Sequence, residues 1–212
     1  MSNLYDYIVI EGNIGAGKSS LAKKLAATFN GNLILEEFED NSFLPKFYAE
    51  PRRYAFTLEM SFLATRFNQL KNNLLQPALF SSCIIADYIF AKCMLFSKVN
   101  LEDDEYNLYL KLFEIINLQL PNPDILIYLH NNIERLQFNI KNRGRIYEQN
   151  ISDEYLQNLQ QTYLNYLNQI YNFPVLVVDC NGLDFVNNLS DFENICNLFS
   201  KPHKKGINYI KP

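Results

Sequence analysis

The 212-residue chain has no tryptophan, only seven glycines and two histidines, and four cysteines. The cysteines show no C-x-x-C or zinc-finger spacing, so we interpret them as small apolar core residues of a reducing compartment. No apolar run approaches the roughly 18 residues of a membrane span, and the N-terminus lacks the basic and apolar regions of a secretory signal. We therefore expect a cytoplasmic protein with no membrane partner.

The chain also lacks an excess of basic residues. It carries 19 Lys and Arg against 23 Asp and Glu, which gives a net charge of −4. A protein that binds nucleic acid needs a basic field against the phosphate backbone, so we expect no nucleic-acid partner. Any local cluster of basic side chains is instead expected to bind small anions.

Repeats and linkers rich in Pro, Gly or Ser are lacking too, which predicts one domain, residues 1–200, followed by a loosely held C-terminal tail, residues 201–212. Short apolar segments alternate with helical segments along the whole chain. This pattern predicts an α/β fold in which five parallel strands are covered by helices on both faces. The expected strands are residues 5–10, 33–35, 83–86, 125–129 and 175–178.

Although glycine is scarce, three of the seven glycines fall between positions 12 and 17. They belong to Gly12-Asn13-Ile14-Gly15-Ala16-Gly17-Lys18-Ser19, which matches the phosphate-loop pattern G-x-x-x-x-G-K-[ST] between an expected strand and an expected helix. Glycines allow backbone N–H groups to point at a phosphate, and the helix N-terminus attracts the same anion. Lys18 is expected to reach the β- and γ-phosphates, and Ser19 to hold Mg²⁺.

Acidic residues follow two of the expected strands. Glu36 lies in a cluster at residues 36–40, where a general base is expected, although a solvated loop is the simpler alternative. Asp87 follows the strand at 83–86, where it is expected near Mg²⁺, with a helix cap as the alternative. Both expectations depend on the rule that parallel sheets bind ligands at the carboxyl ends of their strands.

A long helix is predicted over residues 53–76. Glu59 and Arg66 are seven residues apart and so share one edge of its apolar stripe. Because buried charges are costly, these two residues are expected either to pair with each other or to line a polar pocket.

Two later segments carry further charge. The helix over residues 101–120 begins with acids and has more apolar residues than one face needs, which predicts that part of it forms an oligomer interface. Arg143 and Arg145 flank Gly144 after the next helix, and they indicate a mobile flap that closes over phosphates, with a solvated helix end as the alternative.

Taken in order, these motifs resemble those of the bacterial deoxynucleoside kinases, in the deoxyguanosine/deoxyadenosine kinase branch. The resemblance implies a P-loop kinase fold with a short arginine-bearing lid, ATP with Mg²⁺ as phosphate donor, a deoxynucleoside as acceptor, and a homodimer formed through long helices. It is carried by the phosphate loop, Glu36-Glu37-Phe38-x-Asp40-Asn41, Leu58-Glu59-Met60, Ile85-Ala86-Asp87-Tyr88, Arg143-Gly144-Arg145-x-Tyr147-Glu148 and Asp179.

The resemblance also implies a role for each matching residue. Glu36 takes the proton of the 5′-hydroxyl, Tyr48 and Glu148 hold the 3′-hydroxyl, and Phe96 stacks on the base. The catalytic set is Glu36, Lys18, Arg143 and Arg145. The ATP-binding set is Gly12, Asn13, Ile14, Gly15, Ala16, Gly17, Lys18, Ser19 and Asp179. The nucleoside-binding set is Glu36, Tyr48, Glu59, Arg66, Asp87, Phe96 and Glu148, and the metal-binding pair is Ser19 and Asp87.

Three residues depart from the pattern of many relatives. Tyr88 replaces an arginine, whose charge must come from elsewhere, Asn139 replaces another lid arginine, and Glu59 replaces glutamine. An ionised Glu59 can accept from guanine N1–H and its 2-amino group while Arg66 donates to O6 and N7, so we expect deoxyguanosine to be favoured. Deoxyadenosine or deoxycytidine, a nucleoside monophosphate as acceptor, and a P-loop NTPase switch remain the alternatives.

Overall fold

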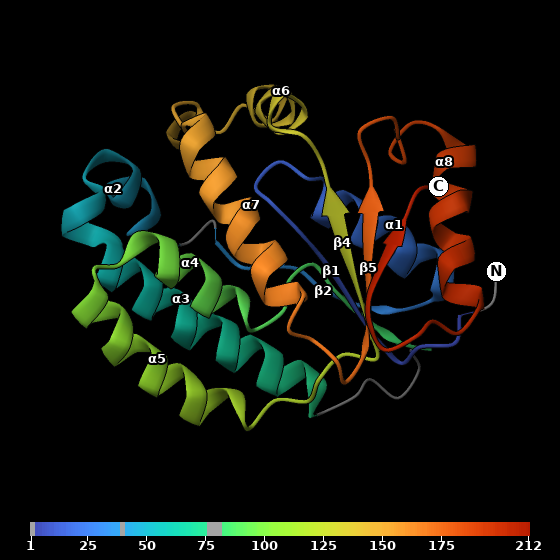
Figure 1. The fold of residues 1–212 in the computed structure, drawn as a ribbon, viewed down its shortest axis with the longest axis horizontal. Coiled ribbons are helices and arrows are strands. Elements are labelled where there is room, and N and C mark those ends of the chain that lie inside the picture. The colour runs from blue at the N-terminus through green and yellow to red at the C-terminus, as the bar shows by residue number, and fades with distance from the viewer. Residues whose placement is uncertain (1–2, 39–40, 76–81) are drawn as a thin grey trace.

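The computed structural model describes residues 3–38, 41–75 and 82–212. In this part of the chain a six-stranded parallel sheet runs in the order β2-β3-β1-β4-β5-β6, with helices on both faces (Figure 1). The predicted α/β fold is therefore confirmed. The strands are β1 (Tyr7–Gly12), β2 (Asn32–Ile34), β3 (Ile84–Ala86), β4 (Ile125–His130), β5 (Pro174–Asp179) and β6 (Gly206–Ile210).

The expected number of five strands is wrong, because β6 comes from the segment predicted to be a loose tail. β6 pairs in parallel with β5, with Ile207 opposite Val175 and Tyr209 opposite Val177. As an edge strand, β6 leaves Tyr209 70% exposed, so its sequence lacks the continuous apolar run of a strand buried on both faces. Lysines and a proline flank it, which made it resemble a terminal coil.

Successive residues of the central strands face opposite helical layers, as the period of two requires. Ile8 and Ile10 of β1 pack with α1 (Lys18–Phe29) and α8 (Leu189–Cys196), whereas Tyr7 and Val9 pack with the opposite layer. That layer contains α3 (Pro51–Leu74), α4 (Lys92–Asn100), α5 (Asp103–Asn117) and α7 (Asp153–Leu167). The sheet is thus buried on both faces, which explains its apolar strands.

The remaining elements are α2 (Leu44–Ala49), α6 (Ile133–Arg143), and two 3₁₀ helices, Ile146–Glu148 and Asn197–Ser200. Of these, α6 lies above the strand ends in Figure 1, and α2 lies at the opposite side of the molecule from α8. The long helix expected over residues 53–76 is α3, and Gln76 at its predicted end lies outside the described residues.

The helix expected over residues 101–120 is α5. It starts after a capping box, in which the Glu102 side chain accepts from the N–H of Glu105 and the Glu105 side chain accepts from the N–H of Glu102. This cap explains why acids begin the segment.

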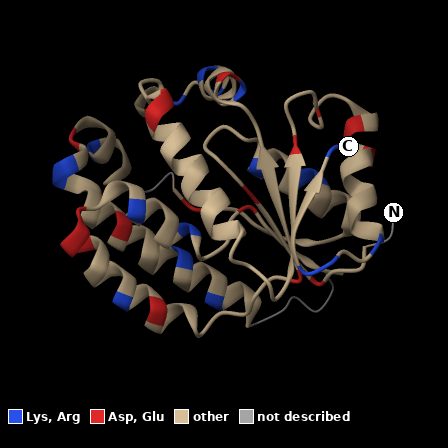
Figure 2. Cartoon of the chain, in the orientation of Figure 1, with Lys and Arg blue, Asp and Glu red and all other residues tan. Residues whose placement is uncertain are grey.

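Lys and Arg are interspersed with Asp and Glu over the helices (Figure 2). Among the described helices, none has both the length and the apolar character needed to cross a bilayer. Strands β1 and β4 are neighbours, and the chain runs from β1 toward β2 on one side of the sheet and from β4 toward β5 on the other. Such a switch point opens a crevice outside the carboxyl ends of the strands, which is where the candidate site lies.

Candidate active site

The phosphate-loop segment connects β1 to α1. Gly15 and Gly17 have φ angles of 81° and 90°, a left-handed conformation that a side chain disfavours, and Gly17 directly precedes α1. The first intrahelical bond of α1 runs from Leu21 N to Gly17 O, so the preceding N–H groups of this helix have no intrahelical acceptor. The segment therefore presents backbone donors at a helix N-terminus, as an anion site requires.

Lys18 lies across this loop. Its Nζ donates to the carbonyl oxygens of Gly12 and Asn13, each at 2.9 Å. Burial, followed by the positive charge of Lys92, lowers the pKa of Lys18 to about 8. An anionic ligand beside Lys18 would favour its charged form, and the charged ammonium would in turn stabilise a bound phosphate.

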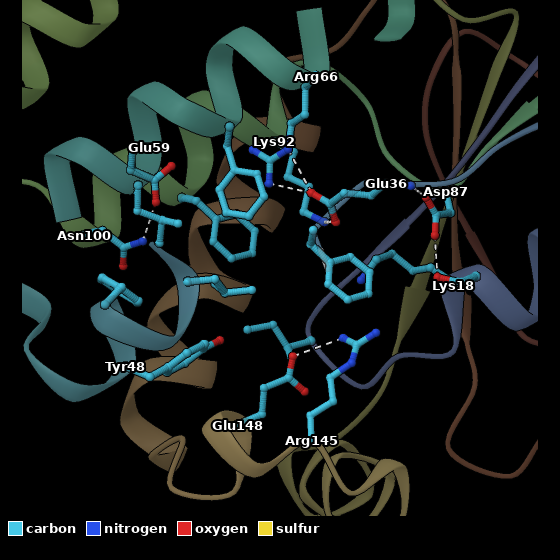
Figure 3. Close-up of a pocket in the computed structure, with 18 of the residues that line it drawn as sticks. Lys18, Glu36, Tyr48, Glu59, Arg66, Asp87, Lys92, Asn100, Arg145 and Glu148 are labelled. Carbon is cyan, nitrogen blue, oxygen red and sulfur yellow. Dashed lines mark hydrogen bonds and ion pairs between the residues drawn. The ribbon is translucent and has the colours of Figure 1, made fainter. Parts of the chain in front are cut away.

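Two cavities meet at Lys18. The inner cavity extends from Lys18 and Asp87 at one end to Glu59 and Asn100 at the other (Figure 3). The outer cavity lies between the phosphate loop, α6 and residues 183–187. Within the described ranges, four residues line both cavities: Lys18, Ser19, Arg143 and Arg145.

Glu36, in the inner cavity, is held by two buried cations. Its Oε1 accepts from Arg66 Nε at 2.8 Å and Nη2 at 2.5 Å, and its Oε2 accepts from Lys92 Nζ at 2.5 Å. Burial alone raises the pKa of the Glu36 carboxyl, but the charges of Lys92 and Arg66 outweigh it and hold that pKa well below its usual range. Glu36 is thus a carboxylate, and Arg66 pairs with Glu36 rather than with Glu59.

Lys92 was not predicted from the sequence, although Tyr88 indicated that a cation had to come from another position. Tyr88 stands where many relatives carry an arginine, and its hydroxyl donates to Gln69 at 2.5 Å, away from Glu36. Lys92, 4% exposed at the start of α4, supplies the cation beside Glu36 instead. The positive charge that an arginine at position 88 would supply therefore comes from Lys92, four residues further along the chain.

Asp87 connects the phosphate loop to the segment after β2. Its Oδ2 accepts from the Ser19 hydroxyl, and its Oδ1 accepts from the backbone N–H of Glu36 at 2.7 Å. The two residues predicted to hold a metal are therefore adjacent, and both offer the oxygen ligands that Mg²⁺ prefers. Asp40, from the same predicted motif as Glu36, lies outside the described residues.

Glu59 lies at the far end of the inner cavity, and Phe96 also lines this cavity. Glu59 is 1% exposed, and its Oε1 accepts from Asn100 Nδ2 at 2.6 Å. Burial, only partly offset by the charge of Arg66, raises the pKa of Glu59 to about 7. Asn100 and Tyr155, which extend this polar chain, were missed because an isolated Asn and Tyr on two separate helices carry no motif.

The arginine-bearing segment lies over the inner cavity. Gly144 ends α6 with a left-handed φ of 74°, and the two arginines beside it donate to different oxygens of Glu148, Arg143 to Oε2 and Arg145 to Oε1 at 3.1 Å. Tyr48 stacks on Tyr147 with ring centroids 5.7 Å apart. The two residues predicted to hold the 3′-hydroxyl, Tyr48 and Glu148, thus lie in one wall.

Asp179 lies apart from the other predicted ATP-binding residues. It ends β5, and its Oδ1 accepts from the backbone N–H and the side chain of Asn181, at 3.1 and 2.7 Å. Its carboxylate lines a cavity with His130 and Tyr209, not the cavity above the phosphate loop. Its role in ATP binding stays a prediction.

This arrangement agrees with comparisons to known proteins. The family model described as "Deoxynucleoside kinase" matches residues 8–202. The chain belongs to the deoxynucleoside kinase family. The matched residues run from β1 to the last 3₁₀ helix, so the deoxynucleoside kinase domain includes every site residue predicted from the sequence.

Individual relatives extend over nearly the whole domain. The chain is 36% identical over 197 residues to the deoxyguanosine kinase of Bacillus subtilis, with 91% of this chain and 95% of the relative covered. It is 34% identical over 193 residues to the deoxyadenosine/deoxycytidine kinase of the same organism, covering 89% and 88%. The deoxyadenosine kinase of M. mycoides with bound dATP superimposes with a TM-score of 0.79 at 28% identity, covering 92% and 99%.

Proposed function

We propose that this protein transfers the γ-phosphoryl group of ATP to the 5′-hydroxyl of a purine deoxynucleoside, with deoxyguanosine favoured. The observation that carries the proposal is the pair of cavities that share Lys18, Ser19, Arg143 and Arg145. A nucleoside in the inner cavity and ATP in the outer one would meet at these residues. Positioning and charge neutralisation, which dominate phosphoryl transfer, both follow from that arrangement.

In this mechanism the 5′-oxygen attacks the γ-phosphorus as the bond to the leaving ADP oxygen breaks, and Glu36 takes the 5′-hydroxyl proton. Glu36 is a weak base because Arg66 and Lys92 stabilise its charge. It therefore accepts the proton late, once the attacking oxygen has begun to bond to phosphorus. Lys18 and the two lid arginines then face the charge that develops on the transferring group.

Mg²⁺ fits beside the phosphate loop. Ser19 and Asp87 are adjacent oxygen donors, and Mg²⁺ in kinases is held by one or two such groups together with phosphate oxygens and water. When bound, the ion would neutralise phosphate charge. Asp87 would also keep Glu36 in place through the backbone bond described above.

Deoxyguanosine is favoured by Glu59. An ionised carboxylate accepts hydrogen bonds, and guanine offers two adjacent donors, whereas adenine and cytosine offer a donor beside an acceptor. Among the residues that the structure describes, Arg66 uses three of its five N–H groups on Glu36 and Cys93, and the other two would be available to the base. The deoxyguanosine and deoxyadenosine/deoxycytidine kinases among the relatives support a deoxynucleoside acceptor, and they leave deoxyadenosine or deoxycytidine as alternatives.

A panel of the four deoxynucleosides with radiolabelled ATP tests this base preference, and Glu59→Gln tests its cause. The substitution replaces an acceptor-only group by a donor and an acceptor. We expect kcat/KM for deoxyguanosine to fall about 10- to 100-fold at neutral pH, relative to deoxyadenosine or deoxycytidine. Glu114→Gln on the exposed side of α5 is the matched control. An unchanged ratio, or a wild type that prefers deoxyadenosine at pH 8, where Glu59 is mostly ionised, would refute Glu59 as the guanine reader.

The lid arginines are expected to act on the chemical step. Arg143→Ala and Arg145→Ala should each lower kcat about 10²- to 10³-fold while KM for the nucleoside changes little, because they act on charge that develops in the transition state. Since each arginine bonds a different oxygen of Glu148, one pair survives in each variant. Steady-state kinetics with Lys141→Ala as the exposed control on α6 tests this. A raised KM with unchanged kcat would instead make the segment a passive surface.

Two further inferences concern the location of the enzyme and its assembly. We infer a cytoplasmic enzyme, because the sequence resembles bacterial kinases and carries reduced, buried cysteines. We infer a homodimer through the long helices, because Leu108, Ile115 and Leu118, in and just after α5, are more than half exposed. Sedimentation of the purified protein tests the dimer.

A further inference from the structure

Asn100, the last residue of α4, has no part in the mechanism above, yet its side chain lies in the inner cavity beside Glu59 (Figure 3). Its Nδ2 donates to Glu59 Oε1 at 2.6 Å, and its Oδ1 accepts from the Tyr155 hydroxyl at 3.0 Å. A carboxylate can only accept, so the amide must turn its NH₂ group toward Glu59 and its oxygen toward Tyr155. Tyr155 thus fixes Asn100, and Asn100 fixes Glu59.

The other oxygen of Glu59 remains available. Within the described part of the chain, Glu59 Oε2 is buried and has no hydrogen-bond partner. Buried polar atoms in native proteins are normally paired, and an unpaired one in a cavity wall indicates a ligand group that completes it. Because Asn100 occupies Oε1, Oε2 is the oxygen best placed to meet the base.

We propose that Asn100 is a positioning residue for purine selectivity, which presents Glu59 Oε2 to N1 of the purine ring. N1 carries a proton in guanine and a lone pair in adenine. An ionised Glu59 therefore accepts from deoxyguanosine, and a protonated Glu59 donates to deoxyadenosine. The inference rests on the proposed kinase function and refines it, because the choice between guanine and adenine then depends on whether Glu59 is protonated.

The surroundings of Glu59 place its proton in the physiological range. Burial raises the pKa of this carboxyl to about 7, while Arg66 and the Asn100 hydrogen bond oppose that rise. Below this pKa Glu59 is protonated and suits adenine, and above it Glu59 is ionised and suits guanine. The titratable and charged groups around it are Glu36, Tyr48 of α2, Arg66 of α3, Lys92 and Cys93 of α4, Tyr109 of α5 and Tyr155 of α7.

The test is the ratio of kcat/KM for deoxyguanosine to that for deoxyadenosine, measured from pH 6 to 8. A carboxyl with a pKa near 7 changes from about one-tenth to about nine-tenths ionised over this range. The kcat/KM for deoxyguanosine should therefore rise about tenfold, and that for deoxyadenosine should fall about tenfold. The ratio should rise about 100-fold. Ionisation of Lys18 or of ATP affects kcat/KM for both substrates alike, so its effect cancels in the ratio. In Glu59→Gln the ratio should not change with pH.

Asn100→Ala should move the midpoint of this pH dependence to higher pH, because the ionised form of Glu59 loses a donor. Tyr155→Phe, which keeps the ring but frees the amide, should move it the same way by less, and it provides the test if Asn100→Ala does not fold. Asn107→Ala, exposed on α5, is the control whose midpoint should stay in place.

A ratio that is constant with pH in the wild type, or a midpoint unmoved by both variants, would overturn the role of Asn100. If both nucleosides are phosphorylated in that case, the proposed function stands. If neither is phosphorylated at any pH, the proposed function fails as well.

Discussion

Replacing Lys18 by methionine is expected to lower kcat for phosphoryl transfer by about 10³-fold or more. Methionine keeps the unbranched stem but removes the cation that faces both cavities. Among the described residues the ammonium has no acidic partner that bonds it directly, and its hydrogen bonds go to the carbonyl oxygens of Gly12 and Asn13. The substitution therefore leaves no buried carboxylate without its hydrogen-bond partner, and the fold should persist.

Single-turnover transfer from radiolabelled ATP measures this effect, with thermal unfolding as the check on the fold. Lys23→Ala is the matched control, because Lys23 lies on the same helix but is exposed. A folded Lys18→Met protein that turns over like the wild type would refute the assignment of the phosphate loop.

Glu36→Gln is expected to lower kcat about 10²- to 10⁴-fold, because glutamine keeps the size of the side chain but cannot take the 5′-hydroxyl proton. The structure adds a second effect. Arg66 and Lys92, both nearly fully buried, lose the negative charge that they share. Removing one partner of a buried ion pair costs about 3–5 kcal/mol, so the free energy of unfolding should fall as well.

Nucleoside titration and chemical denaturation separate these two effects from a loss of binding. Glu37→Gln is the control, since Glu37 is the exposed neighbour and bonds only the Gln69 side chain among the contacts described. If Glu37→Gln lowers kcat and Glu36→Gln does not, the general base has been assigned one residue out of register.

The sequence predicted those features that depend on local patterns. The apolar runs predicted five of the six strands, and the glycines predicted the turn into α1, because strand burial and backbone conformation act over a few neighbouring residues. Glu36 was predicted from its position after an apolar strand, whereas Tyr48 and Glu148 were predicted only through the family resemblance. The structure places these three around one cavity (Figure 3).

The pairing of charges could not be predicted in the same way. Glu59 and Arg66 share a helix edge, but Arg66 bonds Glu36, which is 30 positions away in the chain. Lys92 and Asn100 reach the cavity from the two ends of α4, and their partners lie on other elements. Such contacts depend on how the helices pack on the sheet, and the spacing of residues along one helix does not contain that information.

The central claim is that the γ-phosphoryl group of ATP goes to the nucleoside 5′-hydroxyl beside Glu36. The most direct measurement incubates the protein with γ-labelled ATP and either deoxyguanosine or its 5′-deoxy analogue, and then separates the labelled products. We predict label in the 5′-monophosphate with deoxyguanosine and none in the analogue. Label released only as inorganic phosphate, as from a P-loop NTPase switch, or label transferred equally to the analogue would contradict the account.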